Sequence, residues 1–126
     1  MREIKFRAFQ KERKEMRYDV QQPRYDFGKI LNDKEMYEVM QSTGLLDKLG
    51  KEIYEGDICQ CGANNCIKGK IKYYEGKAQF VLEFYMNKAK QYCTAEMNRI
   101  KQDDESNTNF EIIGNVYENP ELLEVK

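Results

Sequence analysis

The chain has no histidine, no tryptophan and only two prolines among its 126 residues. Histidine is the commonest general base and the commonest metal ligand in proteins. Its absence excludes Ser-His and Cys-His mechanisms, so we expect a protein that is not an enzyme. The chain also lacks a run of about 20 apolar residues, which a membrane-spanning helix requires. Its first residues, MREIKFRAF, lack the apolar segment of a signal peptide. We therefore expect no membrane association, a cytoplasmic location and four reduced cysteines.

Charge is balanced over the whole chain but not along it. The net charge is −1, whereas residues 1–25 hold eight Lys or Arg against four acidic residues. Residues 103–126 hold one Lys against seven Asp or Glu. A basic start can mark a surface for nucleic acid or an acidic partner. Because no dense basic block is present, we favour the alternative that the two ends lie close together, within one chain or across subunits.

Alternation of polar and apolar residues with period two dominates the chain and predicts a mainly β protein. Residues 33–44 are ambiguous, since Asp33 could cap a helix, but the early Thr43-Gly44 turn favours a strand. The apolar run within 78–86 predicts a strand buried on both faces, or one covered by a partner subunit. Strands are expected near residues 3–9, 15–20, 36–41, 69–74, 78–86 and 110–118, with a further strand that starts at Ile58. A short strand or extended segment is expected at 25–31, and helices at 94–102 and 119–124.

Several residues are typical turn formers and are assigned structural roles. Asp47 and Gly50 bracket a tight turn between two apolar segments, because Asp begins such turns and Gly ends them. Gly56 can adopt a positive φ, and Asp57 can accept hydrogen bonds from nearby backbone amides. Further along, structural roles are assigned to Gly114, in the last strand, and to Pro120, which follows Asn119 at the start of the last helix.

Cysteine spacing raises the question of a metal site. Cys59, Cys61 and Cys66 form C-x-C-x4-C, and Cys93 lies well downstream. Four thiolates could hold a tetrahedral zinc ion if Cys93 were the fourth ligand. However, paired zinc ligands usually read C-x2-C, and buried cysteines often act as small apolar residues. We therefore commit to no metal and no cofactor.

Two other groups of residues could carry function. Glu55 and Asp57 could act as a carboxylate pair, but acids two apart on a turn usually form a solvated corner. Tyrosines and lysines also lie close together in the sequence over residues 68–92, where they could stack bases and hold phosphates. Tyr and Lys are equally ordinary strand decoration. The candidate nucleic-acid residues are Lys70, Lys72, Tyr73, Tyr74, Lys88 and Lys90.

Four stretches resemble the YopX family of phage and prophage proteins, in the family's order. They are REIKFRAF at the start, MQSTGLLDKLGKEIYEGDI (40–58), GKIKYYEGKAQF (69–80) and FEIIGNVYENPELLE (110–124). The resemblance implies a mainly β phage or prophage protein, in a family without an established molecular role. It also strengthens the strand assignment for residues 36–41. Phe9 departs from the family pattern, where Trp is common, and the CQCGANNC segment departs as well, so the resemblance gives no support to a zinc site.

Together these observations predict one domain over residues 1–126. We expect a mainly β fold with a small, strongly bent, SH3-like barrel and one or two short helices. An SH3-like barrel is a fold analogy and carries no function. For function we expect a non-enzymatic interaction protein that self-associates, with a phage or host protein as a further partner. A nucleic-acid-binding module in phage replication or regulation is the alternative.

Overall fold

The computed structural model describes residues 4–61, 67–86, 90–96 and 108–123. Short strands and tight turns account for most of it, as expected from the period-two pattern. The elements in chain order are β1 (Phe6–Gln10), β2 (Glu15–Arg17), α1 (Phe27–Asn32), β3 (Tyr37–Leu46), β4 (Glu52–Tyr54), β5 (Asp57–Cys61), β6 (Ile67–Tyr74), η2 (Glu75–Lys77), β7 (Gln79–Met86), β8 (Gln91–Glu96), β9 (Glu111–Asn115) and η3 (Pro120–Leu123).

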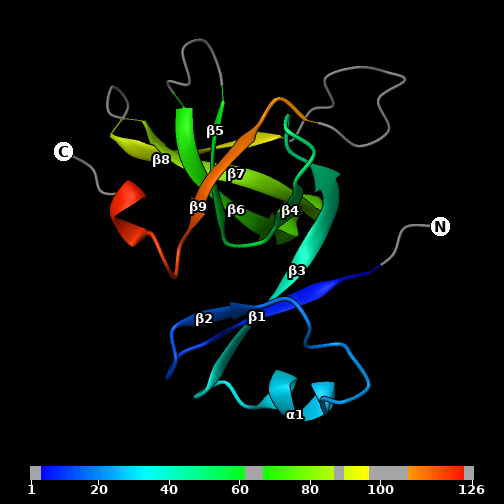
Figure 1. Cartoon of the computed structure of the whole chain (residues 1–126). Helices are drawn as coiled ribbons and strands as arrows, with labels where there is room; N and C mark the ends of the chain where they lie inside the picture. The colour runs from blue at the N-terminus through cyan, green and yellow to red at the C-terminus, as the bar shows by residue number, and fades with distance from the viewer. Residues whose placement is uncertain (1–3, 62–66, 87–89, 97–107, 124–126) are drawn as a thin grey trace.

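The strands form two antiparallel sheets (Figure 1). One has four strands in the order β2-β1-β3-β4, and the other has five in the order β8-β7-β6-β5-β9 and curls into a half-barrel. Figure 1 shows the half-barrel stacked over the β1–β2 hairpin and α1, with β3 running through both levels. Pairing of β3 with β4 shifts between Ser42 and Leu46, where Gly44 has a φ of 82°. Such irregularities bend a strand, so the first half of β3 can pair with β1 and its second half with β4.

Each level has its own hydrophobic core. The half-barrel core consists of Ile53, Cys59, Cys61, Ile71, Leu82 and Phe110. The smaller core below the four-stranded sheet consists of Ala8, Val20 and Ile30, with Phe6, Tyr25, Phe27, Tyr37 and Val39 packed against it. A six-residue helix is too short to be stable alone, so burial of Ile30 in the smaller core accounts for the position of α1.

Two predicted elements are wrong. Residues 25–31 were expected to be extended, but Phe27–Asn32 form α1, whose first turn is capped by the Asp26 side chain accepting from the Lys29 amide at 3.2 Å. Residues 94–102 were expected to be a helix capped by Thr94. Instead, 91–96 form β8, in which Thr94 pairs with Glu83 of β7. The remainder of that predicted helix lies outside the described residues.

The mainly β fold and its strongly bent sheet are confirmed. Residues 36–41 were expected to form a strand rather than a helix, and they do so from Tyr37 on, but the turn expected at Thr43-Gly44 is wrong, because both residues lie within β3, which continues to Leu46. The turn at Asp47 to Gly50 separates β3 from β4, and the 67–86 hairpin has the expected position. The last helix is a 3-10 turn, Pro120–Leu123. Adjacent residues Val81 and Leu82 are 1% and 0% exposed, so the centre of β7 is buried on both faces within this chain. Among the described residues, no helix is both long and apolar enough to cross a membrane.

Candidate functional site

The most distinctive side-chain cluster lies where the half-barrel meets the four-stranded sheet. Successive side chains of β1 point to opposite faces. Ala8 faces the smaller core below, whereas Arg7 and Phe9 face the half-barrel. We call this contact region the junction. Its residues are Arg7, Phe9 and Tyr54 in the four-stranded sheet, Tyr18 directly after β2, and Gly56, Asp57 and Tyr117 in the half-barrel and its turns.

Arg7 forms a buried ion pair with Asp57 at the centre of the junction. The two residues are 2% and 3% exposed, and Arg7 Nη1 lies 2.9 Å from Asp57 Oδ1. Arg7 Nη2 donates to the Glu55 carbonyl oxygen at 3.1 Å, and Nη1 donates to the Tyr18 hydroxyl at 3.3 Å. The guanidinium also lies 4.9 Å from the ring centre of Tyr54. Arg7 thereby ties β1 to the Glu55-Gly56-Asp57 corner.

Asp57 is held by its backbone surroundings as well as by Arg7. Its Oδ2 accepts a hydrogen bond from the Tyr54 amide at 2.8 Å. Burial raises the pKa of the Asp57 carboxyl, while Arg7 and the Tyr54 amide act in the opposite direction. Gly56 has a φ of +88°, and a Cβ there would lie 2.9 Å from Met40 Sδ. These residues form a packed corner, in which the carboxyl is already occupied by protein donors.

The second buried carboxylate, Asp47, connects the β3–β4 turn to β9. Its Oδ1 accepts from the amides of Leu49 and Lys51 at 3.0 and 2.8 Å, and its Oδ2 accepts from the Ile112 amide at 3.1 Å. Gly50 in this turn has a φ of +89°. Asp47 is therefore a turn residue that also anchors a distant strand.

At the end of the chain, a Cβ on Gly114 would lie 2.7 Å from Asn119 Oδ1, so the turn after β9 packs tightly against that strand. The same Asn119 oxygen accepts from the Asn115 amide at 3.3 Å. Pro120 begins η3 directly after this turn. The residues around Gly114 and Pro120 therefore shape the turn that carries Tyr117 to the junction.

The proposed carboxylate pair is not directed at a shared site. Glu55 Oε1 accepts from the Gln41 amide at 3.2 Å, whereas Asp57 faces Arg7. Within the described ranges, no three His, Cys, Asp or Glu side chains come together in a way that could hold a metal ion.

The structure separates the described cysteines. Cys59 and Cys61 lie in the half-barrel core, at 0% and 6% exposed, and burial raises the pKa of the Cys59 thiol. Cys93 is on β8, with β6 and β7 between it and the strand of Cys59. Cys66 lies outside the described residues. The described thiols do not form the centre that a four-cysteine zinc site needs, and Cys59 and Cys61 act as core residues.

The candidate nucleic-acid residues are divided between the two faces of β6. Lys70, Lys72 and Tyr74 share one face by strand alternation, and Tyr73 points to the other, where it contacts the Phe80 ring edge-on. Both lysines form ion pairs with Glu83: Lys70 Nζ lies 3.8 Å from Glu83 Oε1, and Lys72 Nζ lies 3.2 Å from Glu83 Oε2. Of the other two candidates, Lys90 is exposed beside β8, and Lys88 lies outside the described residues. The strand face therefore carries less free positive charge than the sequence suggested.

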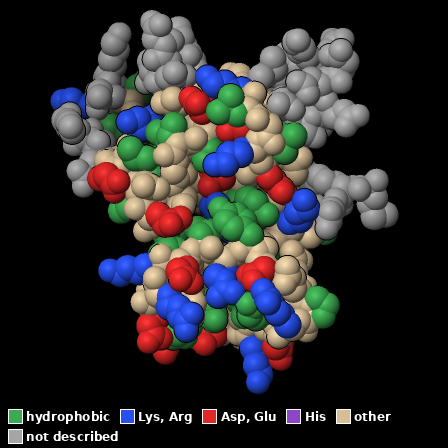
Figure 2. All heavy atoms as spheres, viewed as in Figure 1, with side chains coloured by type: hydrophobic (Ala, Val, Ile, Leu, Met, Phe, Trp, Pro, Cys, Tyr) green, Lys and Arg blue, Asp and Glu red, His purple; other side chains and the backbone are tan. Residues whose placement is uncertain are grey.

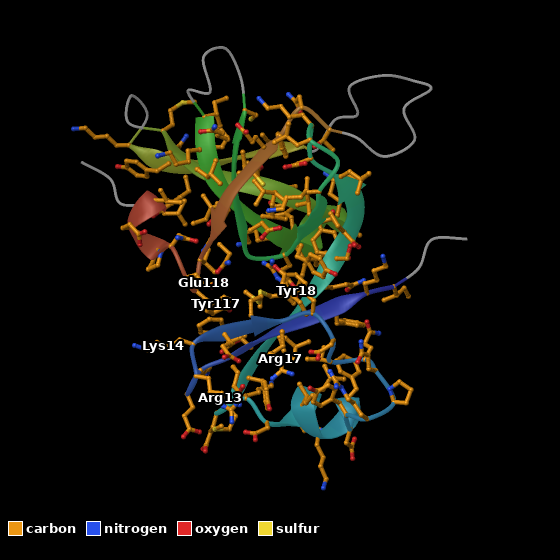
Figure 3. All side chains as sticks on the ribbon, viewed as in Figure 1. Arg13, Lys14, Arg17, Tyr18, Tyr117 and Glu118 are labelled. Atoms are coloured by element: carbon orange, nitrogen blue, oxygen red, sulfur yellow. The ribbon has the colours of Figure 1, made fainter. Side chains whose placement is uncertain are left out.

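The surface over the junction combines aromatic and charged side chains. Figure 2 shows hydrophobic side chains gathered at the level of the junction, with acidic and basic side chains around them. In Figure 3, Tyr117 and Glu118 lie above the β1–β2 hairpin that carries Arg13 and Lys14. The Tyr117 ring stacks on Phe9 at 5.1 Å between centroids, and Tyr18 is 59% exposed over the buried Arg7.

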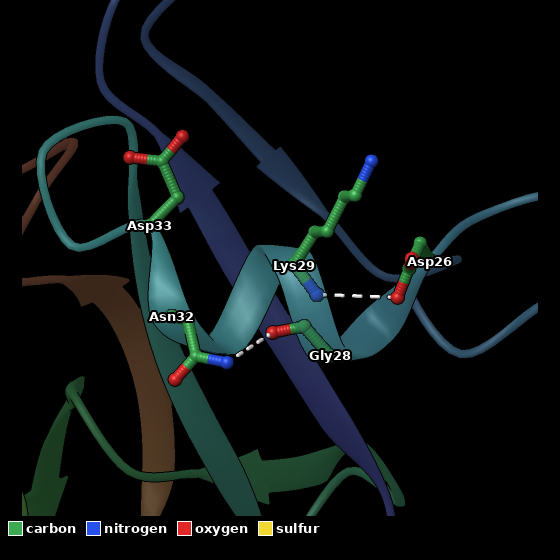
Figure 4. Close-up of a pocket in the computed structure, with 5 residues that line it drawn as sticks. All are labelled: Asp26, Gly28, Lys29, Asn32 and Asp33. Carbon is green, nitrogen blue, oxygen red and sulfur yellow. Dashed lines mark hydrogen bonds between the residues drawn. The ribbon is translucent and has the colours of Figure 1, made fainter.

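A shallow hollow on α1 offers no better site (Figure 4). It is lined by Asp26, Gly28, Lys29, Asn32 and Asp33. The Asp26 side chain accepts from the Lys29 amide, and Asn32 Nδ2 donates to the Gly28 carbonyl at 2.9 Å. The Asp26 and Asn32 side chains of this hollow therefore bond to the backbone of α1, and the Asp33 carboxylate accepts from the Met36 amide at 3.2 Å.

Sequence reasoning missed Arg7 and the aromatic residues of the junction. Glu3, Lys5 and Arg7 alternate with apolar residues, which is typical of a solvent-facing strand face. The contact partner of Arg7 is 50 residues away in the sequence. One signal was available, because Arg7, Asp57 and Tyr117 each lie within a stretch that resembles the YopX family.

The comparisons with known proteins agree with this architecture. A search of curated proteins returned no match. The crystal structure of protein EF1440 from Enterococcus faecalis is similar over 98% of this chain and 100% of that chain, with 26% sequence identity and a TM-score of 0.51. The model of the YopX protein family matches residues 5–124, which is nearly the whole chain. The chain therefore belongs to the YopX family.

Proposed function

We propose that this phage- or prophage-encoded protein is a non-enzymatic interaction module that self-associates in the cytoplasm of the bacterial host. Two features of its chemistry support this proposal. The sequence contains no histidine, and the two buried carboxylates, Asp47 and Asp57, are occupied by backbone amides and by Arg7. Its further partner is a phage or host protein.

The observation that carries the proposal is the open edge of β8. Among the described residues, β8 pairs with β7 and has no strand on its other side. An unpaired strand edge presents free backbone donors and acceptors, and proteins usually protect such edges with Lys, Pro, bulges or short length. Residues 91–96, QYCTAE, span six positions with no Lys or Pro. Tyr92 is 67% exposed and Met86, across from Gln91, is 40% exposed.

The other edges are shorter or already engaged. β2 and β4 have three residues each, and β2 carries Glu15 and Arg17. The start of β9 is tied to the β3–β4 turn, because the Lys48 amide donates to the Phe110 carbonyl at 2.8 Å. This contrast supports β8 as the edge that takes a partner.

The test is the mass of the purified protein in solution as a function of concentration. We expect light scattering coupled to gel filtration to give a multiple of 15.0 kDa that declines on dilution. A mass of one chain at every concentration up to tens of micromolar would contradict self-association.

A nucleic-acid-binding module is the second candidate. The observation in its favour is the column of Lys68, Lys70, Lys72 and Tyr74 on one face of β6. We expect gel retardation of single-stranded oligonucleotides at low salt that is lost in Lys70→Gln/Lys72→Gln. The control variant Lys29→Gln/Lys34→Gln removes the same charge from the α1 region and should retain binding. Equal loss in both variants would indicate a non-specific charge effect.

A further inference from the structure

We propose that two copies of this chain pair antiparallel along β8, with Cys93 on the twofold axis, and so join their five-stranded sheets into one continuous sheet. This inference rests on the proposed self-association and names its interface. It also specifies the residue register, which self-association alone does not.

Symmetry limits the registers that are available. Side chains alternate between the two faces of a strand, and opposed residues in adjacent strands point to the same face. In β8, Ala95 and Cys93 pair with Leu82 and Phe84 and belong to the core face. Tyr92 pairs with Tyr85 on the opposite, convex face. A twofold axis perpendicular to the sheet keeps each face continuous across the two copies. The axis must then pass through a residue, because an axis between two residues would oppose core-face and convex-face side chains.

The axis at Cys93 gives the best cross-strand pairs. It opposes Cys93 to Cys93, Gln91 to Ala95, and Tyr92 to Thr94 of the second copy, so five of the six residues of β8 are paired. An aromatic residue opposite a β-branched one is a favourable cross-strand pair, and twofold symmetry forms the Tyr92–Thr94 pair twice. An axis at Thr94 would place Tyr92 opposite the acidic Glu96, and an axis at Tyr92 would pair only three residues.

The exposed aromatic residue explains why a second copy is the occupant. Tyr92 is 67% exposed, and its ring lies edge-on to that of Tyr85, with centroids 5.2 Å apart. In the proposed register the Thr94 side chain of the second copy covers the free side of the Tyr92 ring. The same strand therefore supplies both the exposed group and the group that covers it, as an isologous interface requires.

The first experiment locates the axis by disulfide formation under mild copper-phenanthroline oxidation. The protein would carry Cys66→Ser, so that the remaining thiols are Cys93 and the buried Cys59 and Cys61. We expect a covalent dimer on non-reducing gels, with the Cys93–Cys93 peptide identified by mass spectrometry. The dimer should disappear in Cys93→Ser. Moving the thiol by one position, with Cys93→Ser/Thr94→Cys, should slow cross-linking. Faster cross-linking from position 94 would overturn the register.

The second experiment uses charge to open the interface. Thr94→Lys places a lysine beside the axis, where the two copies of the charge repel each other and an edge lysine blocks pairing. We expect the mass from light scattering to fall to that of one chain. Tyr74→Lys adds the same charge at an exposed residue of β6, on the same face of the sheet as Thr94 but away from the edge, and should leave the dimer intact. Circular dichroism of both variants checks that they are folded.

The outcomes separate this inference from the proposal on which it depends. A dimer that survives Thr94→Lys and gives no Cys93 cross-link would overturn the β8 interface and leave self-association standing. A wild-type protein that is a monomer at all concentrations would remove both. Loss of the dimer in Thr94→Lys alone, together with the Cys93 cross-link, supports both.

Discussion

Replacing Arg7 by Met should be among the most destabilising substitutions in this protein. Met preserves much of the volume of the side chain but leaves Asp57 as an unpaired carboxylate at 3% exposure. It also removes the donor to the Glu55 carbonyl oxygen. Removing one partner of a buried ion pair typically costs about 3–5 kcal/mol. The unfolding entropy of about 2.1 cal/mol/K per residue, over 126 residues, then predicts a fall in Tm of about 11–19 °C.

The assay is thermal and urea unfolding followed by circular dichroism, with a neighbouring ion pair as the control. Lys5 Nζ lies 3.3 Å from Glu52 Oε1, but these side chains are 43% and 26% exposed. Lys5→Met removes the same charge two residues away and should cost no more than about 1 kcal/mol, because exposed ion pairs contribute little. Equal effects of Arg7→Met and Lys5→Met would refute the argument that burial makes the Arg7–Asp57 pair critical.

The pH dependence gives an independent check on the same pair. Burial raises the pKa of Asp57 above its ordinary value of 3.8, and Arg7 limits that rise. In Arg7→Met the pKa should rise further. A raised carboxyl pKa means that the folded state holds the proton more tightly, so its contribution to stability is present at low pH and is lost as pH rises through the folded-state pKa. The deficit of Arg7→Met relative to wild type should therefore shrink as pH falls toward 4. A deficit independent of pH would contradict this, whereas Arg7→Met/Asp57→Leu should recover much of the stability at neutral pH.

Three further predictions follow from the same geometry. Gly56→Ala should cost about 1–3 kcal/mol more than Gly50→Ala in urea unfolding, because both glycines have φ near +90° but only at Gly56 would the Cβ meet Met40; equal costs would exclude the packing effect. Hydrogen bonds from arginines, Arg17 first among them, lower the pKa of Asp19 to about 2. Asp19 therefore contributes stability above about pH 4 that is lost as pH falls toward 2. In Asp19→Asn the urea midpoint should depend less on pH over that range. The pKa of Tyr54 is raised to about 12 by burial, so stability should fall as pH rises from 10 to 12, and Tyr54→Phe should reduce that fall in urea unfolding.

The strand pattern could be predicted because its signals are local. The 67–86 hairpin combines an alternating first strand, a Glu-Gly turn and an apolar second strand, and the two strands pair antiparallel as expected. Asp47 and Gly50 are typical turn residues at a short connection. Gly56 precedes a strand and has the positive φ that its position requires. Each of these depends on backbone geometry within a few residues.

The errors occur where tertiary contacts override weak local signals. Residues 27–32 make fewer than two helical turns, too few for an apolar periodicity to be recognised. Burial of Ile30 beside Ala8 and Val20 stabilises the helical conformation of this segment. Thr94 is a good helix cap in isolation, but the pairing of β8 with β7 assigns it to a strand. Both outcomes depend on residues distant in the sequence.

Arg7 could not be assigned because a sequence does not reveal what lies on the polar face of a strand. Alternating charged residues on β1 are normally read as solvent-facing. Here the opposite face of the four-stranded sheet meets the half-barrel instead of water, and Arg7 is 2% exposed. The charge that completes the pair comes from Asp57, at the start of another sheet. Only the assembly of the two sheets identifies either residue as buried.

Three of the family-like stretches contribute residues to the junction. REIKFRAF contributes Arg7 and Phe9, EGDI contributes Gly56 and Asp57, and GNVYENP contributes Tyr117, so three of the four stretches meet at the junction. The junction residues Arg7, Phe9, Gly56, Asp57 and Tyr117 therefore all lie in stretches that resemble the family. β8, at residues 91–96, lies outside all four stretches. A substitution at the convex face of β8 lies away from the junction, whereas a substitution at Arg7 removes the buried ion pair that connects β1 to the Asp57 corner. The two variants should therefore behave differently. Thr94→Lys should lower the mass measured by light scattering, but should not change the Tm at dilutions where the protein is a single chain. Arg7→Met should lower the Tm at every concentration.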